Sequence, residues 1–90
     1  MLNIYYSNRF KKDYKLMMKR NVNHEDFEFV VNELINERPL DEKYRDHNLE
    51  GNWKGFRECH INPDWLLIYQ IDNNDLILTL ARTGTHSNLF

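Results

Sequence analysis

The hydrophobic period changes once along this 90-residue chain, and that change constrains the fold more than any other feature. From Phe10 to Ile35 the apolar residues recur at helical spacing, whereas after Trp53 they alternate or form short continuous runs, as in β-strands. The clearest helical stretch places apolar side chains at i, i+3, i+4, i+7 and i+8: Phe27, Val30, Val31, Leu34 and Ile35. Helices followed by a series of strands predict an α+β fold, with two helices packed against one sheet.

The predicted order of elements is one strand, two helices and then three or four antiparallel strands. Leu2 to Tyr6 is short, apolar and aromatic, which favours an opening strand. Ser7 and Asn23 are suited to cap two helices, because their side-chain oxygens can accept hydrogen bonds from the first helical turn. We expect the first helix to end near Arg20 and the second to end immediately before Pro39, which disfavours helical geometry in the residue that precedes it.

The strands are predicted in the second half of the chain. Phe56 to Ile61 alternates loosely, and Trp65 to Ile71 is apolar on both faces, which favours a central strand. Asp72 to Asp75 is typical of a hairpin turn, in which asparagine tolerates positive φ. The strand that follows the turn carries three leucines on one face: Leu76, Leu78 and Leu80. Residues 39–52 have no clear period and predict a long loop, and residues 85–90 predict a short tail.

Length and composition indicate a single domain over residues 1–90, with a core of modest size. The one cysteine, Cys59, excludes an internal disulfide framework and a zinc site built from several cysteines. The longest apolar run, Trp65 to Tyr69, is far too short to span a membrane, and Met1 to Asn8 lacks the apolar core of a signal peptide. We therefore expect a cytoplasmic protein without a membrane partner.

The formal net charge of −2 conceals a segregation of charge along the chain. Arg9 to Arg20 holds six Lys or Arg residues and one acid, whereas Glu25 to Glu42 holds seven acids and one Arg. A protein of this net charge does not attract nucleic acid through its overall charge, but one basic face can still contact phosphates. Such a face is expected on the first helix, where Lys11, Lys12 and Lys15 are the candidates for contact with the phosphates of a nucleic acid.

Several residues that can carry chemistry lie at the ends of predicted elements: His47, His60, Asp64 and His86. They suit two chemistries. Neutral imidazoles and a carboxylate can bind a divalent metal, although no histidine pair has the His-x-x-x-His spacing of a helical zinc site. Alternatively, histidines can move protons in a metal-free ribonuclease, in which the RNA supplies its own 2′-hydroxyl nucleophile. That reaction also needs cations to stabilise the pentavalent phosphate, and the candidates are Arg82, Arg57, Lys54 and Lys43.

Three segments carry a resemblance to a known family. Asp46 to Leu49 has the pattern D-H-x-L, His60 to Trp65 has H-x-x-P-D-W, and Gly84 to Phe90 has G-T-H-S-x-L-F. In this combination the chain resembles the YafQ-type toxins of the RelE/ParE superfamily. The resemblance implies the toxin of a type II toxin–antitoxin system, a ribosome-dependent endoribonuclease that cuts mRNA without metal. It also implies a cognate antitoxin as a partner, with mRNA and the ribosome as targets, and no cofactor.

The family's catalytic set falls on the histidines and the aspartate named above: His47, His60, Asp64 and His86. Arg82 matches a conserved arginine of the family, and the terminal Phe90 is placed to stack on a base. The sequence leaves open which histidine acts as acid and which as base. Two alternatives also remain, a ParE-like toxin that binds protein without cutting RNA and a small metal-binding domain.

Overall fold

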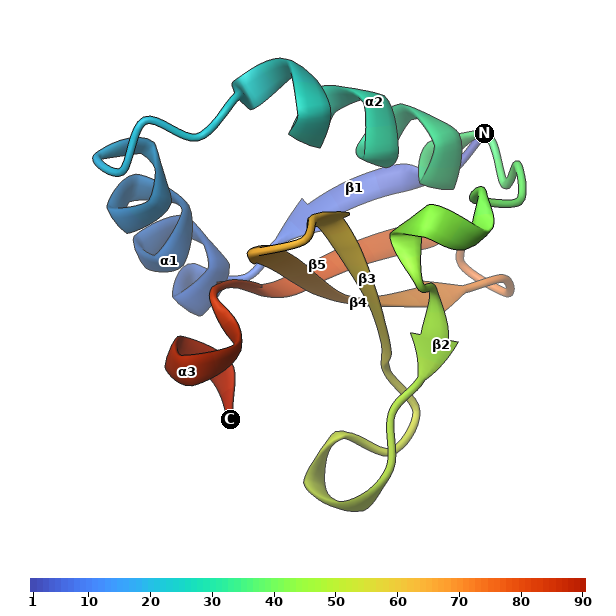
Figure 1. Cartoon of the computed structure of the whole chain (residues 1–90). Coiled ribbons are helices and arrows are strands. Elements are labelled where there is room, and N and C mark those ends of the chain that lie inside the picture. Colours follow the sequence, from blue (N-terminus) through green and yellow to red (C-terminus); the bar gives the residue numbers. More distant parts are fainter.

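Two long helices lie on one face of a five-stranded sheet in the computed structural model, which describes residues 1–90 (Figure 1). The elements in chain order are β1 (Asn3–Tyr6), α1 (Asn8–Met18), α2 (His24–Ile35), the 3₁₀ turn η1 (Glu42–Tyr44), β2 (His47–Asn48), the 3₁₀ turn η2 (Gly51–Trp53), β3 (Arg57–Asn62), β4 (Trp65–Asp72), β5 (Ile77–Gly84) and α3 (His86–Leu89). This order confirms the predicted α+β fold.

The strand order in the sheet is β1-β5-β4-β3-β2. β3, β4 and β5 pair antiparallel in succession, as predicted, and β2, which was not predicted, pairs antiparallel with β3, whereas β1 pairs in parallel with β5. β4 occupies the centre, and its residues Trp65 to Tyr69 are buried on both faces of the sheet. The prediction of a central strand from a run without alternation is therefore confirmed.

The two helices begin where their capping residues predict. The Ser7 side chain accepts a hydrogen bond from the Phe10 N–H at 3.0 Å, and the Asn23 side chain accepts one from the Glu25 N–H at 2.9 Å. The helices bury the apolar faces that their periodicity predicts against the sheet, namely Phe10 and Met17 from α1 and Phe27, Val30, Val31 and Leu34 from α2.

A second, smaller apolar cluster lies on the opposite face of the sheet. It contains Leu66 and Ile68 of β4, Ala81 of β5 and Leu89 of α3, and the partly buried Leu49, Trp53 and Phe56 pack against it. We call this the α3 face. Figure 1 shows α3 and the segment around β2 on this side, away from α2. The α3 face has no long helix over it, so a large ligand can approach it.

The end of α2 differs from the prediction. The helix stops at Ile35 rather than immediately before Pro39. The Arg38 N–H donates to the Glu33 carbonyl at 2.9 Å and the Glu37 N–H to the Leu34 carbonyl at 3.0 Å, and Glu37 has a left-handed φ of 54°. These are the bonds of a Schellman motif, which usually has glycine at its left-handed position. Because glutamate occupies that position here, no residue type signals the earlier end of the helix.

Three further expectations for the second half are also corrected. The predicted loop 39–52 contains two 3₁₀ turns and the short strand β2, and the predicted tail 85–90 contains the helix α3. Leu76 does not share a face with Leu78, because it lies in the β4–β5 turn with φ 56° and is 48% exposed. The Asp72 side chain accepts hydrogen bonds from the N–H groups of Asn74 and Asp75. The residue with positive φ in this turn is Leu76 rather than one of the asparagines.

None of the helices combines the length and the apolar character that a membrane-spanning helix needs.

Candidate active site

Two of the predicted histidines converge on a buried glutamate. His47 Nε2 lies 3.6 Å from Glu58 Oε1, and His60 Nε2 lies 4.0 Å from the same oxygen. The sheet produces this arrangement directly, because His47 of β2 is the cross-strand partner of Glu58 on β3. Glu58 and His60 are two residues apart on one strand, so their side chains share a face.

Glu58 was not predicted from the sequence, yet it is the centre of this cluster. It is 5% exposed, and its Oε2 atom has no hydrogen-bond partner. A buried carboxylate oxygen without a partner is costly, so a functional role is the natural explanation. The available signal was the period of β3, in which Glu58 alternates in phase with His60 while Arg57 and Cys59 point to the other face.

The backbone fixes the orientation of the His47 ring. His47 Nδ1 lies 2.6 Å from the Arg45 carbonyl oxygen. A carbonyl oxygen can only accept a hydrogen bond, so Nδ1 carries a proton and donates it. Nε2 is therefore the atom turned toward Glu58, and a second proton on Nε2 would make the ring a cation facing a carboxylate. The backbone contact therefore presents the second ring nitrogen of His47 to the carboxylate of Glu58.

A row of cross-strand partners connects this cluster to Arg82. Glu58 of β3 pairs with Ile68 of β4, and Ile68 pairs with Arg82 of β5. Cross-strand partners lie on the same face of a sheet, and Ile68 belongs to the apolar cluster of the α3 face. The sheet therefore places a carboxylate and a guanidinium two strands apart on the α3 face, with an apolar side chain between them.

His86 and Phe90 come to this face from α3. Their rings are 5.2 Å apart between centroids, and both residues are exposed. The helix is held by Leu89, which packs in the apolar cluster with Ile68, and by a capping box between Thr85 and Asn88. His86 thus stands over the face that carries Glu58, on an element independent of β3.

Asp64 occupies a different place from the histidine pair. It lies in the exposed turn between β3 and β4, and its N–H donates to the Asn62 side chain at 2.9 Å. Together with Arg20 and Thr85 it lines a hollow of about 350 Å³ between α1 and the start of α3. No ion pair joins Asp64 to a histidine. The structure therefore brings together His47 and His60, and places Asp64 beside the turn into α3.

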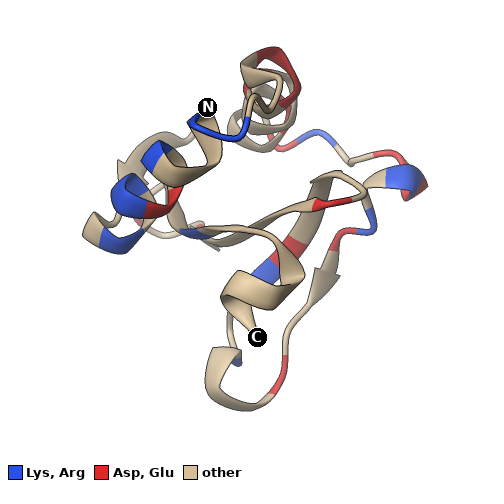
Figure 2. Ribbon diagram, turned by 60° about the vertical axis from the view of Figure 1, so that its left-hand side comes forward, with Lys and Arg blue, Asp and Glu red and all other residues tan.

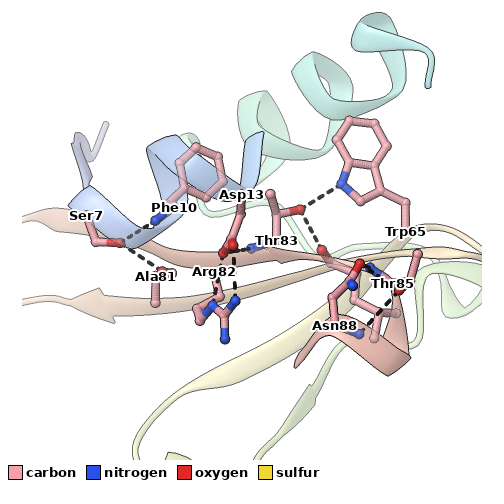
Figure 3. Close-up of polar contacts among 10 residues, drawn as sticks. Ser7, Phe10, Asp13, Trp65, Ala81, Arg82, Thr83, Thr85 and Asn88 are labelled. Atoms are coloured by element: carbon pink, nitrogen blue, oxygen red, sulfur yellow. Dashed lines mark hydrogen bonds and ion pairs between the residues drawn. The ribbon is translucent and has the colours of Figure 1, made fainter. Parts of the chain in front are cut away.

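The four predicted cations have separate surroundings. Lys43 shares a hollow of about 310 Å³ with His60, and Lys54 is exposed next to η2. Arg82 forms two hydrogen bonds with Asp13 of α1 (Figure 3). Arg57 points to the helix-covered face of the sheet, away from Glu58 and His60, so the structure does not place it with the expected phosphate contacts.

Arg57 instead positions His47 through the residues on either side of it. Its guanidinium donates to both carboxylate oxygens of Asp46, at 3.3 and 3.0 Å, and to the Asn48 side chain at 2.7 Å. The bond to Asp46 raises the pKa of Arg57 above its ordinary value. The Tyr69 hydroxyl also donates to Asp46, and burial together with this bond raises the pKa of Tyr69, so the hydroxyl stays protonated. The network holds the residues that flank His47 on the helix side, and the strand alternation then turns His47 toward Glu58.

The predicted basic surface is on α1. Lys11, Lys12 and Lys15 are exposed, and Figure 2 shows Lys and Arg gathered on this helix and acids on α2. The charge segregation along the sequence is thus a segregation in space.

No group of three or more His, Cys, Asp or Glu side chains is arranged to hold a metal ion. The cluster around Glu58 is suited to proton transfer, because imidazole rings and a carboxylate face one another on an open sheet face.

Comparison with known proteins agrees with this architecture. The model of the family of bacterial toxins of type II toxin–antitoxin systems, YafQ, matches residues 2–90. The mRNA interferase toxin YafQ of Escherichia coli K12 is 44% identical over 88 residues, which cover 97% of this chain and 94% of that protein. The chain therefore belongs to the YafQ family of type II toxins, as the resemblance of its motifs predicted.

Two solved structures extend the comparison to the whole fold. YafQ in the E. coli DinJ–YafQ complex is 42% identical, with a TM-score of 0.90 over 100% of this chain and 99% of that chain. A metal-bound toxin from Helicobacter pylori is 47% identical, with a TM-score of 0.93 over 100% of both chains.

Proposed function

We propose that this protein is the toxin of a type II toxin–antitoxin system and that it cleaves mRNA on the ribosome without a metal ion. The observation that carries this proposal is the pair of histidines that meets the buried, partly unpartnered Glu58 on an open sheet face. The E. coli relative, an mRNA interferase toxin, supplies the substrate class. The E. coli complex with DinJ supports an antitoxin as the partner of this chain. A toxin that acts on ribosome-bound mRNA works in the cytoplasm, which is the localisation that this proposal implies.

The reaction follows from the groups on the α3 face. The 2′-hydroxyl of the RNA attacks the adjacent phosphorus while a base removes its proton, and the bond to the 5′-oxygen of the next nucleotide breaks as an acid protonates that oxygen. The products are a 2′,3′-cyclic phosphate and a 5′-hydroxyl.

We assign the base to the cluster of Glu58, His47 and His60, because two imidazole rings and a carboxylate lie close together there and each of these groups can accept a proton. The distances of 3.6 and 4.0 Å exceed those of good hydrogen bonds, and such contacts often tighten only when the substrate is bound. We assign the acid to His86, because it is exposed and approaches the same face from a separate element, as the leaving group requires.

The remaining residues have supporting roles in this proposal. Arg82 neutralises the pentavalent phosphate, and Lys43 and Lys54 attract the RNA backbone on either side. Phe90, exposed beside His86, stacks on a base next to the cleaved bond. Asp64 lies beside the turn that leads into α3, where it orients the approach of the RNA to His86.

The test is an analysis of the ends produced from ribosome-bound mRNA by two toxin preparations, one stripped of metal with EDTA and then desalted, the other untreated. We expect 2′,3′-cyclic phosphate and 5′-hydroxyl ends at the same rate with both preparations. Ends with a 3′-hydroxyl, or a loss of cleavage by the stripped toxin, would contradict the mechanism. A ParE-like toxin would leave the mRNA intact.

A further inference from the structure

The basic segment Arg9 to Arg20 contains one acid, Asp13, for which the proposed function has no use. Its side chain turns away from solvent toward β5 and is 13% exposed, while the Arg82 side chain that it meets is 15% exposed. A negative charge near bound RNA repels phosphate. Its presence among lysines and arginines therefore calls for a compensating role.

Asp13 binds one edge of the Arg82 guanidinium through both carboxylate oxygens (Figure 3). Asp13 Oδ2 accepts a hydrogen bond from Arg82 Nε at 2.9 Å, and Oδ1 accepts one from Arg82 Nη2 at 3.0 Å. A guanidinium has five N–H donors. Asp13 uses the two on the side edge, so both hydrogens of Nη1 and one hydrogen of Nη2 remain free, and one hydrogen from each of these nitrogens forms the terminal edge. That edge can bind two oxygens of a phosphate at once.

The backbone around Arg82 is held by the same carboxylate. The Thr83 N–H donates to Asp13 Oδ2 at 3.2 Å. The register of β4 and β5 shifts here, because Ile68 pairs with Arg82 whereas Tyr69 pairs with Leu80. Ala81 is thus an extra residue in β5, and such bulges redirect neighbouring side chains. Asp13 therefore fixes both the guanidinium and the strand at a place where regular pairing does not.

We propose that Asp13 is a positioning residue that holds the terminal edge of the Arg82 guanidinium toward the scissile phosphate. This inference rests on the proposed function, in which Arg82 neutralises the pentavalent phosphate. Without Asp13 the guanidinium samples several rotamers, and a displacement of about 1 Å in such a group costs about 10²-fold in rate. The attraction of the RNA to the protein does not fall, because a negative charge has been removed.

The slower reaction and the undiminished attraction of RNA predict different changes in kcat and KM. Asp13→Asn has nearly the shape of the native side chain but turns an amide N–H₂ toward the Arg82 donors. We expect it to lower kcat for ribosome-bound mRNA by about tenfold to 10²-fold, while KM stays the same or falls. Asp13→Ala should behave alike, and it provides a second variant if the first one folds poorly.

A double-mutant cycle with Arg82→Ala tests whether Asp13 acts through Arg82. If it does, Asp13→Asn has no further effect on kcat once Arg82 is absent. A wild-type kcat for Asp13→Asn, or the same fold loss in both backgrounds, would overturn the inference while leaving the proposed function intact. A wild-type rate for Arg82→Ala would overturn this inference and also remove Arg82 from the proposed mechanism.

Ser7→Ala is the matched control. The Ser7 hydroxyl ties α1 to β5 as well, since it donates to the Ala81 carbonyl at 2.8 Å, but it does not contact Arg82. We expect this variant to lower the melting temperature and to leave kcat unchanged. A loss of kcat equal to that of Asp13→Asn would mean that loosening α1 alone explains the effect, and it would overturn the inference.

Discussion

At the scale of single residues, burial determines which ionisable groups can react. Cys59 lies directly after Glu58 on β3, but its side chain points into the helix-covered core and is 0% exposed. Burial raises the pKa of the Cys59 thiol far above its ordinary value, and the charges of Asp46 and Glu58 raise it further. Because the thiolate is the nucleophile, a higher pKa leaves less of the reactive form at any neutral or mildly alkaline pH.

We therefore predict that Cys59 does not react with a disulfide reagent such as Ellman's reagent in the folded protein at pH 8. The thiol should react only as fast as the chain unfolds, and at the rate of a free cysteine in guanidinium chloride. Absorbance of the released thiolate measures both rates. Reaction of the native protein at the unfolded rate would contradict the burial of this residue. The same measurement reports the folded fraction of every variant proposed above.

At the scale of elements, the short helix α3 is held in place by only a few side-chain contacts. It has four residues, too few to be stable in isolation. Thr85 Oγ1 accepts a hydrogen bond from the Asn88 N–H at 3.3 Å, and the Thr85 N–H donates to the Asn88 side chain at 3.3 Å. Leu89 is the only buried residue of the helix. The position of His86 thus depends on one cap, on the apolar contact of Leu89 and on a hydrogen bond that Arg20 Nη1 donates to the Asn88 side chain at 3.3 Å.

We predict that Thr85→Ala lowers the rate of mRNA cleavage by about fivefold, since loss of a cap costs about 1 kcal/mol. The melting temperature of the whole domain should change little, because α3 frays without opening the main core. Ser87→Ala, in the same helix and exposed, is the control and should cleave at the wild-type rate. An unchanged rate for Thr85→Ala would show that His86 does not need the cap.

The elements that could be predicted are those whose signals are local. The start of α2 followed from Asn23, and the centre of the sheet followed from the apolar run in β4. The parallel pairing of β1 with β5 could not be predicted, because its partners are more than 70 residues apart in sequence and no local pattern encodes them. β2 was missed because a strand of two residues has no measurable alternation.

In the candidate site, too, only what local sequence motifs encode could be predicted. The motifs identified the histidines, but they could not show that His47 and His60 share the carboxylate of Glu58, since the register of β2 and β3 creates that contact. The same register places Arg57 on the face opposite to His60, where it holds Asp46 and Asn48. Residue type alone does not distinguish an arginine that binds phosphate from one that positions a loop.

At the scale of the whole molecule, the net charge of −2 hides a basic helix and an acidic helix. Binding to the phosphate backbone depends on the local charge of the contacting surface and weakens with salt. α1 can therefore contact ribosomal RNA although the protein as a whole is an anion.

We predict that reversing Lys11, Lys12 and Lys15 to glutamate weakens binding to ribosomes and leaves the fold intact, because all three side chains are exposed. Co-sedimentation with ribosomes over a series of salt concentrations measures the effect, and the salt dependence should become shallower. As a control, Asn73→Asp with Asn74→Asp adds negative charge at the exposed β4–β5 turn and should bind as the wild type does. Unchanged co-sedimentation of the triple variant at moderate salt would exclude α1 from the contact.

The central claim is that the cluster around Glu58 performs proton transfer, and Glu58→Gln tests it most directly. The substitution keeps the shape of the side chain and removes its charge and its basicity. Because the native carboxylate is buried with one oxygen unpartnered, the free energy of unfolding should not decrease. Single-turnover cleavage of ribosome-bound mRNA should slow by about 10²-fold to 10⁴-fold, whereas Glu50→Gln, at an exposed position, should cleave normally. Cleavage by folded Glu58→Gln at the wild-type rate would contradict the account.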